Sequence, residues 1–335
     1  MLVSDRAAAD KQITMPGVPK TALQGDLTIP TKWSVVGQVR KLNIFPVKSL
    51  AHVEVDSFKT GVFGAESGHM VDRQFMVLDK KNKLTTSRKF PHMSLIQPEL
   101  TQTNLILRYP GVEDISITIP SVKSLEGGQE FEIFGDTCRG INLGEEVGSW
   151  LSDVILNDPE GGMQLLYHPK ILSSRPDKPK DEVIAPNTRP GDKPYYADTF
   201  AYMMMSQPSI EEVNKLLEQE DVDLVVEEKR FRPNIFIDGE FLAFAEDKWA
   251  FIKIGESVVF RNARVCDRCV FTTVDPFMGD KHPQGEPLKT LRKYRCAEDP
   301  DEKKAYGTSP FLGVFLSVET AGNIKAGDTV SIGQI

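Results

Sequence analysis

The cysteine pair at residues 266–269 is the strongest chemical signal in the sequence. Cys266 and Cys269 enclose Asp267 and Arg268 in the order Cys-Asp-Arg-Cys, directly after a predicted strand. Two thiols near a cation can be kept as thiolates, the form that binds soft metals. The pair therefore predicts a metal site, a redox-active dithiol or two buried thiols without a ligand.

A structural zinc site is the main alternative that the spacing leaves open. Cys266, Cys269, His282 and Cys296 could supply three sulfurs and one nitrogen, the ligand set of many zinc modules without enzymatic activity. A single Cys-x-x-Cys spacing is shared by zinc sites, dithiols and unligated thiols, so it does not decide among them.

Several cations stand beside predicted strands in distant parts of the chain. Lys48 and Ser49 follow the segment Asn-Ile-Phe-Pro-Val, where a loop can present a cation and a hydroxyl to a phosphate. Arg73 and Arg88 lie at strand ends, and Arg232 lies between an aromatic residue and a proline, a rigid setting for a guanidinium group. Solvated turns, ion pairs at a rim and an inter-domain salt bridge are the alternative interpretations.

Charge and composition limit the classes of function. The chain has 335 residues and a formal net charge of -8, which argues against nucleic acid as a partner because proteins that bind it present a basic face. An anionic small ligand must therefore be held by cations gathered locally. The 4 cysteines do not suggest a disulfide framework in a chain of this length. No secretion signal, transit pattern or membrane-spanning apolar run is found, so we expect an intracellular protein, cytoplasmic or mitochondrial.

The elements that must position these residues are mostly strands. Short runs rich in Val, Ile, Phe and Thr, split by Gly, Pro and Asn, are typical of β structure. Strands are predicted at residues 35–43, 53–59, 74–79, 201–205, 234–237, 249–254 and 257–264, with a hairpin joining 105–109 to 115–119. The tail at 312–335 is predicted to form two short strands.

Three helices are predicted outside these strands. One opens at Gly144 and Glu145, one follows a capping box formed by Ser209 and Glu212, and one spans 287–294 with Pro287 as its first residue. The fold class is therefore β-rich α+β: a β-barrel with an N-terminal β domain and peripheral helices.

The patterns divide the chain into four segments. We expect a disordered arm at 1–33, an N-terminal β domain at 34–158, a connecting segment with a proline-rich loop at 159–198 and a barrel domain at 199–335.

Eight segments, in order, resemble one family across nearly the whole folded region. They are NIFPVKS, VDRQFMV, LTTSRKFP, RFRPNIFIDG, FAEDKW, CDRCVFTTVDP, EPLKTLRKYR and YGTSPFLG. The family is the MOSC proteins, and within it the eukaryotic amidoxime-reducing component, known from mitochondria. The resemblance implies a MOSC-type barrel, an N-terminal MOSC β domain and a molybdenum cofactor, Mo-molybdopterin, between them.

The resemblance also assigns roles to residues. Cys269 matches the molybdenum ligand and the catalytic position, whereas Cys266 matches a neighbouring thiol not known to bind the metal. The other positions implied to contact the cofactor are Lys48, Ser49, Arg73, Thr199, Phe200, Arg232, Asp267, Arg268 and Phe315. Asp267 stands where animal relatives carry small polar residues, which leaves substrate preference near the metal open.

The function that the resemblance implies is reduction of amidoximes, hydroxylamines and N-hydroxylated bases by two-electron N–O cleavage at molybdenum. A small b-type haem cytochrome and an NADH-dependent flavoprotein reductase are the implied electron donors, and a monomer is expected. The alternative is a cofactor carrier or sulfur-transfer MOSC protein, and a zinc-binding interaction module follows as a third class. Animal members begin with a hydrophobic membrane anchor that this sequence does not show, so membrane attachment is not expected.

Overall fold

The computed structural model describes residues 28–171, 175, 186–192 and 194–333. Residues 1–27 of the predicted disordered arm, and most of the predicted proline-rich loop, lie outside these ranges. Within the described part of the chain, no helix is both long and apolar enough to cross a membrane.

A closed barrel of seven strands forms the larger body of the molecule. Strand β1 pairs with β19 on one side and with β14 on the other, and this second pairing closes the sheet. The order around the barrel is β14 (Ile235–Asp238), β13 (Tyr202–Ser206), β17 (Phe311–Thr320), β16 (Val258–Asp267), β15 (Phe251–Ile254), β19 (Thr329–Gly333) and β1 (Trp33–Ile44), with β2 (Val53–Val55) paired to β1.

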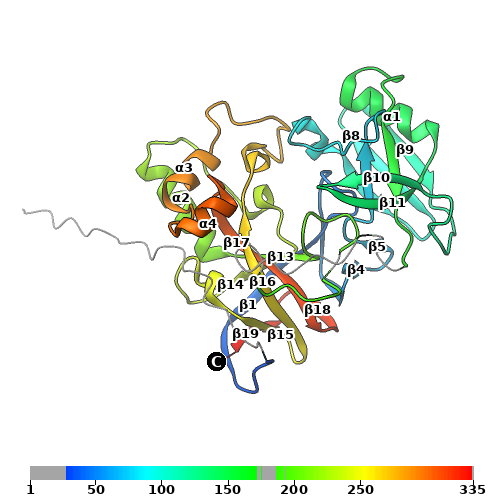
Figure 1. Ribbon diagram of the computed structural model, residues 1–335. Coiled ribbons are helices and arrows are strands. Elements are labelled where there is room, and N and C mark those ends of the chain that lie inside the picture. The colour runs from blue at the N-terminus through cyan, green and yellow to red at the C-terminus, as the bar shows by residue number, and fades with distance from the viewer. Residues whose placement is uncertain (1–27, 172–174, 176–185, 193, 334–335) are drawn as a thin grey trace, which may run out of the picture.

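Smaller sheets, mostly from the first half of the chain, lie beside the barrel (Figure 1). They are β10 (Gln129–Ile133), β11 (Asp136–Asn142), β12 (Gln164–Tyr167) and β6 (Phe75–Leu78); β18 (Asn323–Lys325), β3 (Ser57–Gly61), β4 (Gly64–Ser67) and β5 (Met70–Val71); and β7 (Gln97–Leu100), β8 (Asn104–Tyr109) and β9 (Val112–Thr118). The strands β8 and β9 confirm the predicted hairpin.

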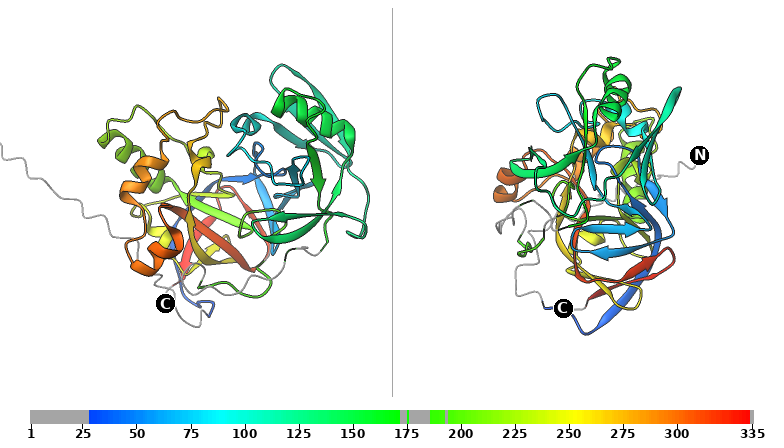
Figure 2. Two further views of the ribbon diagram at one scale, coloured as in Figure 1. Left: turned by 45° about the horizontal axis from the view of Figure 1, so that its top comes forward. Right: turned by 90° about the vertical axis from the view of Figure 1, so that its right-hand side faces the viewer.

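The helices lie outside the sheets. Helix α1 (Glu145–Leu156) packs on the small sheets, whereas α2 (Gln207–Gln219), α3 (Leu288–Tyr294) and α4 (Pro300–Tyr306) flank the barrel on the side away from them (Figure 2). Four short 3-10 turns complete the described elements: η1 (Pro91–Leu95), η2 (Glu228–Phe231), η3 (Ala245–Lys248) and η4 (Val270–Thr273). The expected β-rich barrel with peripheral helices is thus confirmed.

The predicted capping box of α2 is wrong by three residues. Ser206 is the N-cap, and its hydroxyl accepts a hydrogen bond from the backbone N–H of Ser209. The Ser209 hydroxyl instead donates to the buried carboxylate of Glu246 and accepts from the backbone N–H of Phe244. Tertiary hydrogen bonds therefore take the side chain that the local pattern assigned to capping.

Three further features differ from the sequence expectation. Pro287 is the N-cap of α3, not its first helical residue. The tail forms three strands instead of two. They are β17, which runs unbroken for ten residues, followed by β18 and β19. Strand β16 also continues through Cys266 to Asp267, so the cysteine pair begins inside the strand and not after it.

Two separate apolar cores hold the barrel and the small sheets. The barrel interior contains Leu42, Ile252 and Leu316, whereas Phe75 and Leu151 belong to the other core; all five are fully buried. Because each body has its own core, the loops between them are free to carry polar side chains into the space where the bodies meet.

Candidate functional site

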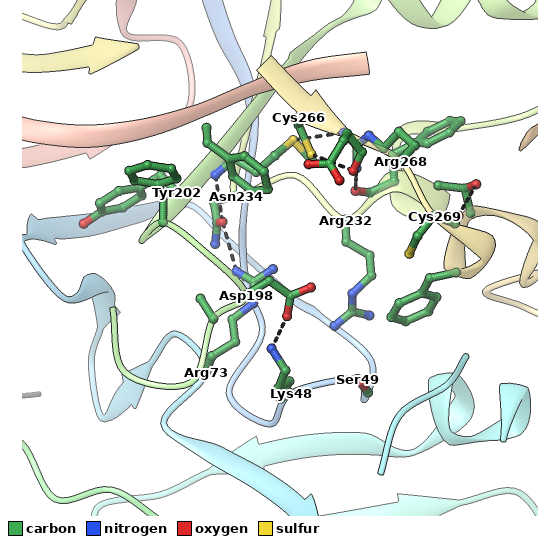
Figure 3. Close-up of a pocket in the computed structure, with 18 of the residues that line it drawn as sticks. Lys48, Ser49, Arg73, Asp198, Tyr202, Arg232, Asn234, Cys266, Arg268 and Cys269 are labelled. Atoms are coloured by element: carbon green, nitrogen blue, oxygen red, sulfur yellow. Dashed lines mark hydrogen bonds and ion pairs between the residues drawn. The ribbon is translucent and has the colours of Figure 1, made fainter. Parts of the chain in front are cut away.

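A cavity lies where loops of the small sheets face one end of the barrel (Figure 3). Loops after β1 and β5 contribute to one wall, and η2, the end of β16 and η4 contribute to the other. The lining residues are Lys48, Ser49, Arg73, Arg88, Ala197, Asp198, Phe200, Tyr202, Met203, Arg230, Phe231, Arg232, Asn234, Cys266, Asp267, Arg268, Cys269, Phe271, Thr272 and Phe315.

Most of the residues singled out in the sequence line this cavity. Lys48, Ser49, Arg73, Phe200, Arg232, Asp267, Arg268, Cys269 and Phe315 are all part of the lining. Thr199 is half-buried and does not belong to it. Segments separated by more than two hundred residues are therefore brought together around one space.

The two thiols of the cysteine pair have opposite environments. Cys269 is exposed, as the N-cap of η4, and its sulfur points toward the space bordered by Arg232 (Figure 3). Cys266 is only 4% exposed on β16, and burial raises the pKa of its thiol to about 12. Of the two, Cys269 is the thiol that an incoming ligand can reach.

The ligands of the zinc alternative are not assembled. Among the residues with described positions, no group of three or more His, Cys, Asp or Glu side chains could hold a metal ion. His282 Nδ1 accepts hydrogen bonds from the backbone N–H groups of Gln284 and Glu286, and Cys296 donates to the carbonyl of Thr308. Neither His282 nor Cys296 lines the cavity.

Lys48 is held deep in the wall. It is 5% exposed, donates a hydrogen bond of 2.7 Å to the carbonyl of Tyr196 and pairs with Asp198. Burial lowers the pKa of Lys48 from 10.5 to about 8, because the attraction of Asp198 does not fully compensate the loss of water. A second anion beside the ammonium group would stabilise its charged form.

A buried polar network fixes Arg73. Its Nη1 donates to the carboxylate of Asp72 and, at 3.0 Å, to Oδ1 of Asn234. Asn234 Nδ2 in turn donates to Asp72 Oδ1 at 2.9 Å, which also accepts from the backbone N–H of Phe45. Asp72 and Asn234 are 2% and 1% exposed, so the network ties the β1 and β14 ends of the barrel to the arginine.

The aromatic ring of Phe45 contacts two like charges. The Cζ atoms of Arg73 and Arg232 each lie 4.2 Å from its ring centroid, within the range of cation–π attraction. Arg232 also donates to the carbonyl of Leu50, and burial together with Arg73 lowers the pKa of Arg232 to about 9. Phe45 thus stabilises two guanidinium groups that repel each other.

Three lining residues have backbone conformations that side chains seldom adopt. The φ angles of Ser49, Arg73 and Arg232 are 71°, 47° and 61°. Left-handed conformations of this kind cost of order 1–3 kcal/mol each and concentrate at binding and catalytic sites. The surrounding hydrogen bonds hold these three residues in place at that cost.

The guanidinium group of Arg268 is anchored by backbone carbonyls. It points into the wall, where it donates to the carbonyls of Leu312 and Phe231. Gly313 passes directly behind it with a φ of 75°, and a Cβ there would lie 2.6 Å from the carbonyl of Met204. Arg268 therefore adds positive charge to the wall without an ion-pair partner shown at its guanidinium group.

The charge balance of the cavity favours an anionic ligand. Its lining holds six basic side chains, Lys48, Arg73, Arg88, Arg230, Arg232 and Arg268, and two carboxylates, those of Asp198 and Asp267. This excess stands against a formal charge of -8 for the whole chain. An anionic group with a soft metal fits these residues, since cations surround the space and an exposed thiol borders it.

Several residues of the site, in the cavity lining or packed behind it, were not singled out in the sequence. Phe45 belonged to the quoted segment NIFPVKS, and Asn234 followed Arg232 in RFRPN, but neither was given a role. Asp198 carries no local pattern that distinguishes it from other acidic residues in loops. Only the contact between distant segments shows that it balances Lys48.

Comparison with known proteins agrees with this geometry. The MOSC N-terminal beta barrel domain family matches residues 36–158, and the MOSC domain family matches residues 192–331. The chain is 32% identical over 295 residues to mitochondrial amidoxime reducing component 2 of Bos taurus, and the match covers 88% of this chain and 83% of the bovine protein. It is 32% identical to mitochondrial amidoxime-reducing component 1 of Homo sapiens, over 88% of this chain and 82% of the human protein. It is 31% identical to component 1 of Danio rerio, over 89% of this chain and 86% of the fish protein. The chain therefore belongs to the MOSC-domain family, among the amidoxime-reducing components.

Proposed function

We propose that this protein is a molybdenum-cofactor-dependent reductase of N-hydroxylated small molecules: amidoximes, hydroxylamines and N-hydroxylated bases. The observation that carries the proposal is the meeting of the exposed Cys269 thiol with six basic side chains in one cavity. The names of the relatives describe amidoxime reduction, which supports an oxidoreductase role at the level of the family.

Different residues are proposed to bind the metal and the pterin of the cofactor. Cys269 would supply a thiolate to the molybdenum, and Lys48, Ser49, Arg73, Arg232 and Arg268 would hold the anionic pterin and its phosphate. Thr199, Phe200, Asp267 and Phe315 are proposed as further contacts. When bound, the cofactor supplies the two-electron reduction that breaks the N–O bond.

The protein's own side chains would orient the cofactor, balance its negative charge and determine which thiol binds the metal. Lys48, with a pKa of about 8, is mostly protonated at neutral pH and gains a counter-charge when an anion binds. Phe45 holds Arg73 and Arg232 through cation–π contacts of 4.2 Å to one ring. Cys266 keeps its proton at neutral pH, so it does not compete with Cys269 for the metal.

Electrons are proposed to arrive from outside the chain. The sequence contains neither a nicotinamide nor a flavin fingerprint, so a small b-type haem cytochrome and its NADH-dependent flavoprotein reductase are the proposed donors. A soluble small-molecule substrate reaches the same cavity from solvent.

The proposal is tested by comparing Cys269→Ala with Cys266→Ala. Cofactor-loaded protein is assayed for benzamidoxime reduction with the donor pair, and its metal content is measured by elemental analysis. We expect Cys269→Ala to abolish turnover and Cys266→Ala to retain it with molybdenum bound. Turnover that survives in Cys269→Ala, or zinc in place of molybdenum in the wild-type protein, would refute the proposal.

A further inference from the structure

A second cavity lies beside the first and shares part of its wall. Arg230, Arg232 and Phe271 line both spaces, and His52, Lys229 and Phe277 line only the second. None of the described residues that line the second cavity is acidic. It is therefore a distinct space next to the proposed reductase site, lined by basic groups and aromatic rings, with Arg232 over the ring of Phe271 at 5.1 Å.

Two of its basic groups lack an anionic partner. Within the described parts of the chain, the side chain of Lys229 shows no hydrogen bond or ion pair, and its Nζ lies 5.8 Å from the ring centroid of Phe277. The guanidinium group of Arg232 donates to the carbonyl of Leu50 at 2.7 Å. Arg230 differs from both, because Asp275 neutralises it through a contact of 2.7 Å.

His52 provides a neutral donor in the same wall. Its ring lies 5.9 Å from that of Phe45, on which Arg232 stacks. Burial lowers the pKa of His52 to about 4, and Arg232, Lys229 and Lys41 act in the same direction while Glu228 opposes them. The imidazole is therefore neutral near pH 7 and retains one N–H that can donate to an anion.

Apolar side chains complete the lining of the second cavity. Phe271 and Phe277 contribute rings, and Val274 and Pro276 continue the apolar lining between them. Phe277 is 62% exposed, so a ligand can reach its ring from solvent. A ligand with one charged end and one flat apolar end would cover both parts of this wall.

We propose that this second cavity binds an organic carboxylate, with its charged end between Lys229 and Arg232 and its apolar body against Phe271 and Phe277. The site goes beyond the proposed reductase function, because it adds His52, Lys229 and Phe277, which do not line the cofactor cavity, and needs no turnover. Since Arg232 borders both spaces, a bound carboxylate would also reduce the repulsion between Arg232 and Arg73, which both lie 4.2 Å from the ring centroid of Phe45.

The test titrates the full-length protein with benzoate and with benzamide, its neutral counterpart of similar shape. Binding is followed by the NMR resonances of the His52 ring, assigned with His52→Gln, since His52 lines the second cavity and not the first. We expect benzoate to shift the resonances at a concentration at least about tenfold lower than benzamide, as one charge-assisted contact implies. Inorganic sulfate, which lacks the apolar body, should bind more weakly than benzoate.

Matched variants separate this site from general attraction of anions. Lys229→Met should remove the preference for benzoate over benzamide, whereas Lys253→Met should keep it, because Lys253 lies over Trp33 at 5.2 Å on the far barrel strand β15. Lys48→Met, in the first cavity, should also keep it, and urea unfolding of each variant checks that it is folded. Equal binding of benzoate and benzamide, or unchanged benzoate binding in Lys229→Met, would overturn the proposal.

Discussion

Iodoacetamide should modify Cys269 well before Cys266 in the folded protein. The thiolate is the reacting form of a cysteine. Burial raises the pKa of Cys266 from 9.0 to about 12, which lowers its thiolate fraction at pH 8 by about a thousandfold. A thiolate of higher pKa is intrinsically more nucleophilic, and this raises the rate constant of the Cys266 thiolate by a factor of about 20. Cys266 should therefore react about 50-fold more slowly than in the unfolded chain, and its 4% exposure slows it further.

The rates are measured by quenching samples over time and quantifying the labelled cysteine peptides by mass spectrometry. The urea-unfolded chain is the internal reference, since all four cysteines are then equally accessible. Cys138, which is fully buried and whose pKa burial raises to about 11, serves as a second protected thiol. Loading the cofactor should protect Cys269 from the reagent. Equal folded-state rates for Cys266 and Cys269 would refute the assignment of Cys269 as the accessible ligand.

Two other predictions concern stability. Burial and Asp247 raise the pKa of Glu246 to about 7, so its contribution to stability is complete below pH 4.5 and is lost as the pH rises through 7. By urea unfolding, Glu246→Gln should be more stable than the wild type at pH 8 by up to roughly 3 kcal/mol. This gain in stability should largely vanish at pH 5, and a gain that is independent of pH would contradict the raised pKa of Glu246. Gly313→Ala should lose about 2 kcal/mol or more, because its Cβ would lie 2.6 Å from the carbonyl of Met204; wild-type stability in the same assay would show that this wall can move.

Local patterns predicted the elements that depend on neighbours in the sequence. The alternation of Ile115 and Ile117 with polar residues identified the hairpin, because one face of that strand is buried and the other is not. Helix α2 was predicted from its apolar stripe, but its N-cap was not, since the partner of Ser209 is Glu246, far along the chain. The tail strands were undercounted because β17 is buried on both faces and shows no alternation.

The site was predicted where motifs carry it and missed where only long-range contacts define it. Lys48, Arg73, Arg232 and Cys269 stand in recognisable segments, and the structure brings them to one cavity. Phe45 could not be selected, because its role depends on two arginines that approach it from distant loops. The direction in which a side chain points is set by the completed packing, which a linear pattern does not contain.

The pairing of β1 with both β14 and β19 has a consequence for folding during synthesis on the ribosome. The first barrel strand emerges early, but its partner β19 is made only near the end of the chain, on the order of 15–60 s later at ordinary rates of translation. During that interval the edges of β1 offer unpaired N–H and C=O groups to any neighbouring chain. The barrel therefore closes only after residues 329–333 have been made, and a nascent chain stalled before residue 329 should recruit chaperones until its release.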